Sequence, residues 1–408
     1  MGHIHVKHGF PFKSEYFAEA GELIVLTPGN FWEAGGFKHQ LGKEKFYPSN
    51  FPPEYLHEKG DLIVAMTEQA EGLLGSMALV PEGNRYLHNQ RIGKVTATSD
   101  EVCLAFLYHA FKTRAVREQL SNTASGSKVR HTSPERIHDV SIPLPSVDEQ
   151  QRITTVLSTI DAKIDLNNRI NAELEALAKT IYDYWFVQFD FPDANVRPYK
   201  SSGGAMVWND ALKREIPAGW KALQLDELVD VVKEGVGPED FDGTTPYVGL
   251  EHIARKSIVL SAWSISSEAT SQKIAFRYGD ILFGKIRPYF HKVAFATIDG
   301  IASADAIVMR PKRPQFSGLA LETVFSDSFV MAATTSSTGS KMPRADWNVM
   351  KRYLVAAPDQ LSDTLSKYQD FFQPIASKID SHVRQNLELT RLRDWLLPLL
   401  MNGQVRVT

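Results

Sequence analysis

Two long stretches with a helical spacing of apolar residues constrain the fold of this chain more than any other feature. The first runs from Ser146 to about Phe189, and its apolar residues recur every three or four positions, which indicates one amphipathic helix. At a rise of about 1.5 Å per residue, some forty residues form a rod of roughly 60 Å. A single helix of that length does not fit inside a compact domain, so we expect it to act as a spacer that packs on a partner helix. Its apolar positions are Ile153, Val156, Leu157, Ile160, Ile164, Ile170, Leu174, Leu177, Ile181 and Trp185.

The second stretch, from Leu361 to Leu400, supplies that partner. The two stretches align without a gap, with Lys163 falling on Lys378 (378 − 163 = 215). Because charged and amide residues match as well as apolar ones, we infer an internal duplication. The further matches at this shift are Ile164 with Ile379, Asp165 with Asp380, Arg169 with Arg384, Asn171 with Asn386, Glu173 with Glu388 and Leu177 with Leu392.

The second stretch also has the spacing of a coiled coil. Its apolar residues keep a near-3.5 repeat, which is typical of a left-handed helix pair. Amides interrupt the pattern at Asn167, Asn168, Asn171 and Asn386. They either fix the register of the pair from a buried position or face solvent. The repeating apolar residues are Leu361, Leu365, Tyr368, Phe372, Ile375 and Ile379.

The composition is that of an ordinary globular protein with room for two or three domains. The chain has 408 residues, of which 43% are hydrophobic and 23% charged, and a net charge of −3, so a DNA-binding face would have to be a local basic patch. No run of eighteen apolar residues occurs, which excludes a membrane-spanning helix. Cys103 is the only cysteine, which fits a reducing compartment. We see no secretory signal at the N-terminus and expect a cytoplasmic protein.

The remaining sequence divides into two globular segments that resemble each other. We expect a first domain over 1–145, a connector helix over 146–190, a linker over 191–204, a second domain over 205–358, and a second helix with a tail over 359–408. In both domains the same order recurs: a buried strand (60–66 and 279–285), an amphipathic helix (101–120 and 320–334), a polar loop, and a strand before the long helix (140–145 and 353–358). Strands mixed with a few helices make each domain α+β.

This arrangement resembles the specificity subunit of type I restriction-modification systems. The most specific part is 142–191, with its Pro-x-Pro exit, a Glu-Gln pair near the helix start, the Ile-Asp-x-Lys-Ile core and a Trp-Phe end. Residues 216–229 look like the opening of a second target-recognition domain, and residues 9–14 look like the start of a first. The first domain has no Pro-x-Gly-Trp opening like that of the second, so either it begins short or the gene start is truncated.

The resemblance implies two duplicated α+β target-recognition domains, separated by two long antiparallel coiled-coil helices. Each domain would read one half of a split, asymmetric site in double-stranded DNA, and the helices would set the spacer and dock two modification (methyltransferase) subunits. The subunit itself would be non-catalytic and without cofactors. S-adenosylmethionine, ATP and Mg are then expected on the partner subunits, which include restriction (translocase) subunits.

Polar loops with glycine and a cation are the candidate DNA contacts, since backbone N–H groups and basic side chains bind phosphate oxygens and arginine can read guanine. Gly126 and Gly339 open two such loops in equivalent places. A third candidate is the basic loop around Pro288, although its arginine could equally pair with an acid of the fold. The expected contact residues are Ser127, Lys128, Arg130, Lys285, Arg287, Tyr289, Ser340, Lys341 and Arg344. Residues 89–91 either read bases or form an ordinary polar hairpin tip.

Enzyme motifs are weak throughout the chain. The sequence has no Glu-x-Lys nuclease pattern and no P-loop, and Asn50-Phe51-Pro52-Pro53 has the wrong order for an amino-methyltransferase. His3, His5 and His8 lack carboxylate or cysteine companions for a metal, so we expect no metal site and a mobile N-terminus. The alternative to a DNA reader is a non-catalytic coiled-coil scaffold with two protein-binding heads. DNA affinity that falls steeply with salt would distinguish the two.

Overall fold

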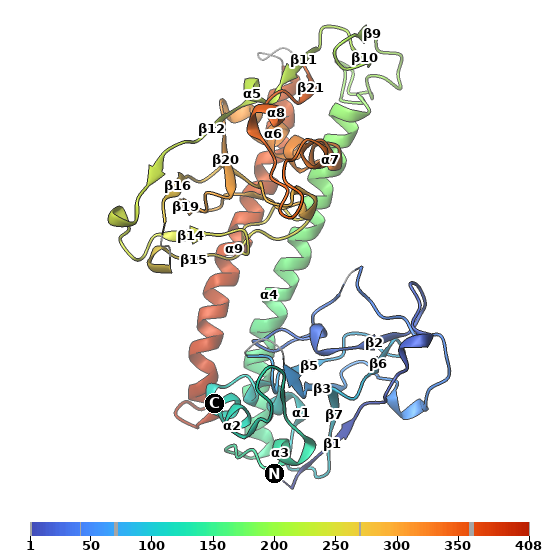
Figure 1. The fold of residues 1–408 in the computed structure, drawn as a ribbon, viewed down its shortest axis with the longest axis vertical. Coiled ribbons are helices and arrows are strands. Elements are labelled where there is room, and N and C mark those ends of the chain that lie inside the picture. The colour runs from blue at the N-terminus through green and yellow to red at the C-terminus, as the bar shows by residue number, and fades with distance from the viewer. Residues whose placement is uncertain (1, 41, 69–71, 269–270, 359–362, 408) are drawn as a thin grey trace. The chain divides into compact units, whose positions relative to one another are not determined.

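The structure, a computed structural model, describes residues 2–40, 42–68, 72–268, 271–358 and 363–407. It divides into two compact units. Unit 1 comprises 1–163 and 389–408, and unit 2 comprises 164–388. Each unit therefore contains one globular α+β domain together with one segment of each long helix (Figure 1). The domain boundaries expected from the sequence remain a prediction.

The core of unit 1 is a four-stranded antiparallel sheet in the order β1-β7-β3-β5. Leu62, Val64 and Val95 of this sheet pack against α1 and α2 in one apolar cluster. The helices of the domain are α1 (Leu104–Ala110), α2 (Arg114–Thr123) and α3 (Pro134–His138). Its strands are β1 (Ile4–His8), β2 (Ile24–Leu26), β3 (Leu62–Ala65), β4 (Thr67–Glu68), β5 (Met77–Leu79), β6 (Tyr86–His88), β7 (Ile92–Ala97) and β8 (Arg130–His131).

Unit 2 is built on a corresponding sheet in the order β12-β20-β17-β18, with a five-stranded sheet, β13-β16-β19-β14-β15, beside it. Its helices are α5 (Leu225–Leu228), α6 (Ser317–Phe325), α7 (Asp327–Thr335) and α8 (Trp347–Met350). Its strands are β9 (Met206–Asn209), β10 (Arg214–Pro217), β11 (Lys221–Gln224), β12 (Val229–Val231), β13 (Gly235–Val236), β14 (Pro246–Val248), β15 (Ser264–Ile265), β16 (Lys273–Phe276), β17 (Ile281–Gly284), β18 (Val293–Phe295), β19 (Gly300–Ala302), β20 (Ala306–Pro311) and β21 (Leu354–Ala357).

The strand registers show that the two domains share a frame. Leu62 of β3 lies opposite Val95 of β7, and Ile281 of β17 lies opposite Met309 of β20. Likewise Ala65 lies opposite Ile92, and Gly284 lies opposite Ala306. The duplication inferred from the sequence therefore extends to the pairing of the central strands.

Two long helices were expected, and both are present. Helix α4 covers Val147–Tyr182 and continues as a π-helical turn over Asp183–Val187, and α9 covers Asp363–Met401. The repeating apolar residues of α9 from Leu365 to Ile379 are all buried, as the coiled-coil spacing predicts; Leu361 lies outside the described residues.

Within each unit the two helix segments run antiparallel. In unit 2, Asn167 contacts Gln385, whereas Phe186, further along α4, contacts Tyr368, which lies earlier in α9. In unit 1, Asp161 pairs with Arg393 at 3.0 Å, and Ile153 and Leu157 pack in a cluster with Leu397 and Leu400. The α+β class with long antiparallel helices is thereby confirmed.

Three local predictions were wrong. Residues 140–145 form no strand, because no strand in the described part of the chain pairs with them. Each predicted amphipathic helix is instead two short helices, since Thr113 and Ser326 leave the helical conformation and each begins a second helix. The N-terminus is not free, because β1 pairs along its whole length with β7.

Candidate nucleic-acid interface

The first glycine-containing loop is the tip of a short hairpin. Ser125 and His131 exchange both backbone hydrogen bonds, at 3.0 and 2.8 Å, and residues 126–130 connect them. Gly126 has φ +98°, and a Cβ there would lie 2.1 Å from the carbonyl oxygen of Val129. Only glycine fits this turn without displacing backbone.

The second loop repeats this construction. Thr338 and Arg344 exchange both backbone hydrogen bonds, at 3.1 and 2.9 Å, and Gly339 has φ +99°. The residues correspond at one shift (338 − 125 = 213 and 344 − 131 = 213). The two Gly-Ser-Lys triplets therefore occupy the same place in the same hairpin.

Each hairpin is attached to its own sheet at the same point. Thr132 N–H donates to the carbonyl of Met66 at 2.9 Å, and Ala345 N–H donates to that of Lys285 at 2.8 Å. Met66 directly follows β3 and Lys285 directly follows β17. The central sheet of each domain thus fixes the position of its loop.

The loop tips present polar side chains to solvent. Ser127, Lys128, Ser340 and Lys341 are all exposed, and within the described ranges none of these four side chains has a hydrogen-bond or ion-pair partner. An exposed ammonium beside a hydroxyl and backbone N–H groups can bind phosphate oxygens. Contact of these four residues with phosphate stays a prediction.

Arg130 is held inside the fold. Its guanidinium donates to Glu68 Oε1 at 3.1 Å and to the hydroxyl of Ser121 at 2.9 Å. Glu68 is only 3% exposed and also accepts the N–H of Leu74 at 2.8 Å. Arg130 therefore anchors the first hairpin, and its availability to DNA stays a prediction. Arg344 is exposed and lies 3.6 Å from Asp305.

In unit 2 the structure brings two candidate segments together. Arg287 N–H donates to the carbonyl of Pro343 at 2.7 Å, and Ile286 forms a β-bridge with Arg344. The basic loop around Pro288 and the second hairpin therefore form one surface. Tyr289 is 51% exposed on it.

The two basic candidates in that loop, Lys285 and Arg287, have different surroundings. Lys285 Nζ donates to the carbonyl of Ala304 at 2.5 Å. Arg287 has φ +50° and a buried Nε without a partner in the described structure. The neighbouring Phe290 ring carries the guanidinium of Arg255 at 3.8 Å. Arg255, which was not among the contact residues expected from the sequence, adds a cation beside Phe290, whose ring lies 4.9 Å from that of Tyr289.

The turn at 89–91 belongs to a hollow in unit 1. The hollow has a volume of about 500 Å³, and the rings of Phe12 and Phe17 line it together with Lys45, Asn89 and Arg91. Thr67, also in its lining, lies opposite His131 of the first hairpin. The turn is thus more than an isolated hairpin tip, because it adjoins the strand that holds the Gly-Ser-Lys loop.

The corresponding turn of unit 2 carries the opposite charge. Arg91 N–H donates to Asn89 Oδ1 at 3.0 Å, and Asp305 N–H donates to Ser303 Oγ at 3.2 Å. Met66 N–H donates to the carbonyl of Arg91 at 2.9 Å. In the same way, Lys285 N–H donates to the carbonyl of Asp305 at 3.0 Å. The same backbone turn therefore presents a cation in one domain and an anion in the other.

The interrupting amides form a polar layer between the helices of unit 2. Asn167 is 0% exposed and donates to Gln385 and Asn386 at 2.8 Å each. Asn386 donates in turn to Asn168 at 2.8 Å, and Asn171 bonds to His382 at 2.8 Å. Of the two possibilities left open by the sequence, solvent exposure is wrong for Asn167 and Asn171. Asn168 is exposed and Asn386 is half-buried. The two buried amides favour this register, because a slip would take Asn167 and Asn171 away from their hydrogen-bond partners.

The described residues contain neither a metal-binding cluster nor a membrane-spanning helix. No group of three histidine, cysteine, aspartate or glutamate side chains there could hold a metal ion. Of the helices described, none has the length and apolar character needed to cross a membrane.

The comparisons with known proteins agree on one family. The family described as type I restriction modification DNA specificity domain matches residues 3–176. The chain is 26% identical over 321 residues to the type I restriction enzyme MjaIX specificity subunit of Methanocaldococcus jannaschii, across 76% of this chain and 70% of the relative. It is 26% identical over 210 residues to the EcoDI specificity subunit of Escherichia coli, across 48% of this chain and 46% of the relative.

A solved structure supports the fold. The type I restriction-modification S subunit from M. genitalium superposes with a TM-score of 0.55 at 16% sequence identity, across 98% of this chain and 94% of that chain. At this identity the likeness concerns the fold alone.

Proposed function

We infer that this chain, which belongs to the type I restriction-modification specificity subunits, reads DNA sequence for such an enzyme. Each α+β domain recognises one half of a split, asymmetric target in double-stranded DNA. The paired helices set the unread spacer and dock two modification subunits, and restriction (translocase) subunits complete the assembly. The subunit performs no catalysis and holds no cofactor; S-adenosylmethionine, ATP and Mg belong to its partners.

One observation carries this proposal: each domain holds an exposed Gly-Ser-Lys hairpin on equivalent backbone hydrogen bonds. Two copies of one cationic loop, each fixed to its own sheet, are what a reader of two half-sites needs. Half-sites one DNA turn apart, roughly 34 Å, lie on the same side of the duplex. A helix as long as α4 is sufficient to span such a distance.

Duplicated surface residues on the helices support two docking sites. Leu177 in unit 2 and Leu392 in unit 1 correspond at the helix shift (392 − 177 = 215), and they are 44% and 43% exposed. Two similar surfaces on a duplicated chain favour two copies of one partner. We expect Leu177→Glu and Leu392→Glu each to reduce the number of bound modification subunits from two to one, as measured by native mass spectrometry.

A methylation map tests the proposal directly. The chain is expressed with its modification subunit in a host without other adenine methylation, and modified adenines are located by sequencing. We expect a split motif with a fixed gap, and replacing residues 205–358 should change one half only. A continuous motif would contradict two-headed reading. Absence of methylation by an assembled, active complex would favour the scaffold with two protein-binding heads.

Charge reversal tests the loops themselves. Lys128→Glu and Lys341→Glu should each weaken DNA binding by about tenfold or more and lower the slope of log affinity against log salt by about 1 or more. Lys59→Glu, an exposed position at the opposite end of β3, is the matched control. Unchanged affinity for both loop variants, in folded protein, would remove these loops from the interface.

A further inference from the structure

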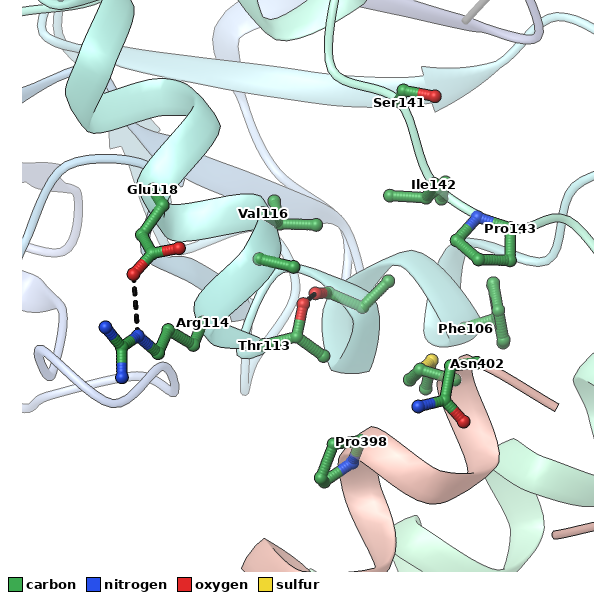
Figure 2. A pocket seen from close by; sticks show the side chains of 13 residues that line it. Phe106, Thr113, Arg114, Val116, Glu118, Ser141, Ile142, Pro143, Pro398 and Asn402 are labelled. Atoms are coloured by element: carbon green, nitrogen blue, oxygen red, sulfur yellow. Dashed lines mark hydrogen bonds and ion pairs between the residues drawn. The ribbon is translucent and has the colours of Figure 1, made fainter. Parts of the chain in front are cut away.

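An apolar groove lies on unit 1 where its domain meets the end of α9 (Figure 2). It has a volume of about 420 Å³. Residues of α1, of α2, of the segment after α3 and of the last turn of α9 line it. The lining includes Phe106, Ala115, Val116, Ile142, Pro143 and Met401.

The corresponding place in unit 2 is filled by the chain itself. Ile142 corresponds to Val355 (355 − 142 = 213), and Met401 corresponds to Phe186 (401 − 186 = 215). Val355 pairs with Leu223 of β11, and the Phe186 ring lies 5.7 Å from that of Trp220. In unit 2, therefore, a strand preceded by a tryptophan occupies the site that is an open groove in unit 1.

The backbone of unit 1 keeps the edge with which β11 pairs in unit 2. In unit 2 the carbonyl of Tyr353 accepts the N–H of Leu225 at 2.9 Å. Hydrogen-bonded residues alternate along an antiparallel strand, so Val355 and Ala357 also face β11. Their equivalents in unit 1 are Ile142 and Leu144 (357 − 144 = 213).

Prolines occupy only the other positions of this edge. Pro143 and Pro145 alternate with Ile142 and Leu144, so the two missing N–H groups are ones that a paired strand would not use. The backbone groups of Ser141 also point away from the edge. Its N–H donates to Gln119 Oε1 at 2.8 Å, and its carbonyl accepts from Gln119 Nε2 at 3.0 Å. Within the described ranges the backbone of Ile142 makes no hydrogen bond.

We propose that this groove binds an extended segment of a partner polypeptide, which adds a strand along Ile142–Leu144 and inserts a large aromatic side chain beside Met401. The occupant has the chemistry of residues 216–224 of this chain: a tryptophan followed by the short strand Lys221–Gln224, in which Leu223 is buried. Strand addition supplies backbone hydrogen bonds, and the groove supplies side-chain selectivity. This inference does not depend on DNA binding.

A second copy of this chain is the less suitable occupant. Its own Trp220 is 9% exposed and stacks on Phe191 at 4.9 Å, and its β11 is paired along four residues with β21. Releasing that segment would open the core of unit 2. A segment of another polypeptide carries no such cost.

Peptide binding to the full chain tests the groove. A fluorescent peptide that copies residues 216–225 should bind, and the same peptide with alanine in place of tryptophan should bind at least about tenfold more weakly. Leu144→Pro removes an N–H from the pairing edge and should also weaken binding by about tenfold, whereas Leu144→Ala keeps that N–H and should change it by less than about threefold. Ala115→Trp, at an exposed helix position, should block the groove.

Each result of the peptide-binding experiment supports or overturns the proposal. Absence of saturable binding, or equal binding to all folded variants, would overturn the proposal; the latter would mean that the peptide exchanges into unit 2 instead. A photoreactive side chain at position 115 then identifies the occupant in the complex assembled with the modification subunit. Crosslinking to that subunit supports a partner polypeptide, whereas crosslinking to a second copy of this chain, or to nothing, overturns the assignment.

Discussion

The two hairpins of the candidate interface share their backbone and differ in the side chains that hold them. The first is fixed by Arg130, which reaches the buried carboxylate of Glu68. Among the described residues, the second hairpin is held by the exposed pair between Arg344 and Asp305, 3.6 Å apart. The duplicated sheet and its backbone hydrogen bonds are therefore sufficient to position a loop. Side chains around the loop can change without moving it, which suits two domains that read different sequences.

The cores of the two units also carry different side chains at an equivalent position. His109 in α1 and Glu322 in α6 occupy equivalent positions (322 − 109 = 213), and both are buried. Burial lowers the pKa of His109 to about 4, and the charge of Lys112 adds to the effect. Burial raises the pKa of Glu322 to about 8, helped by the charge of Glu175. One position thus holds a neutral base in one unit and a neutral acid in the other.

The largest expected effect is an opposite pH dependence of the two units. Glu322 contributes on the order of 4 kcal/mol to the free energy of unfolding of unit 2. This contribution is fully present below pH 4.5, the ordinary pKa of the carboxyl in the unfolded chain, and it is lost as pH rises to about 8. His109 contributes roughly 3 kcal/mol to the free energy of unfolding of unit 1. This contribution is fully present above pH 6.5, the ordinary pKa of the imidazole, and it is lost as pH falls to about 4. Pulse proteolysis in urea with mass spectrometry, at pH 5 and pH 8, measures the two units separately.

Single substitutions assign this effect to the paired residues. Glu322→Gln should stabilise unit 2 at pH 8 and have little effect at pH 5. His109→Gln should reduce the acid sensitivity of unit 1, although His88, whose pKa burial lowers to about 3, should leave part of it. If both units lose stability in the same pH direction, the comparison between these two positions fails.

The second prediction concerns the buried anchor of the first hairpin. Glu68→Ala leaves the guanidinium of Arg130 and the N–H of Leu74 without their acceptor, and removing one partner of a buried pair costs about 3 kcal/mol or more. Thermal unfolding and proteolysis of unit 1 report this loss. Arg287, which follows β17 at the position equivalent to Glu68 (287 − 68 = 219), provides the comparison: Arg287→Ala should cost unit 2 less. Equal losses would mean that the two hairpins are held alike.

The features that the sequence predicted correctly depend on local periodicity or on the repeat. The buried face of α9 follows from the spacing of Leu365, Phe372 and Ile379. The equivalence of the Gly-Ser-Lys loops follows from a constant shift between the halves. The apolar spacing and the constant shift can both be read from one sequence, because neither depends on tertiary contacts.

The features that the sequence missed depend on contacts between distant residues. A strand at 140–145 requires a partner, and unit 1 provides none among its described residues, whereas the similar segment in unit 2 pairs with β11. The association of the Pro288 loop with the second hairpin rests on backbone contacts between distant residues, from Arg287 N–H to the carbonyl of Pro343 and between Ile286 and Arg344. The anchoring of Arg130 could not be foreseen, because Glu68 lies 62 residues away.

The third prediction uses the two loop glycines. Gly126→Ala would place a Cβ 2.1 Å from the carbonyl oxygen of Val129, whereas Gly339→Ala would place one 3.3 Å from that of Met342. Both have positive φ, so each alanine is strained by about 1 kcal/mol, and the first also forces the backbone to move. We expect a loss of about 2 kcal/mol or more for Gly126→Ala and about 1 kcal/mol for Gly339→Ala, measured by chemical unfolding. Similar losses would show that the two turns differ less than their contacts indicate.

The smallest expected effect comes from Asp305→Asn, at the position where the first domain carries Arg91. The ion pair with Arg344 is exposed, and such pairs contribute less than about 1 kcal/mol, so unfolding of unit 2 should barely change. Removing an anion beside Arg344 should instead raise DNA affinity by about twofold to threefold at low salt, and the gain should fade as salt screens the interaction. Arg91→Gln in the first domain should act in the opposite direction. A loss of affinity for Asp305→Asn would mean that this carboxylate contacts a base directly, as an acceptor for a cytosine amino group.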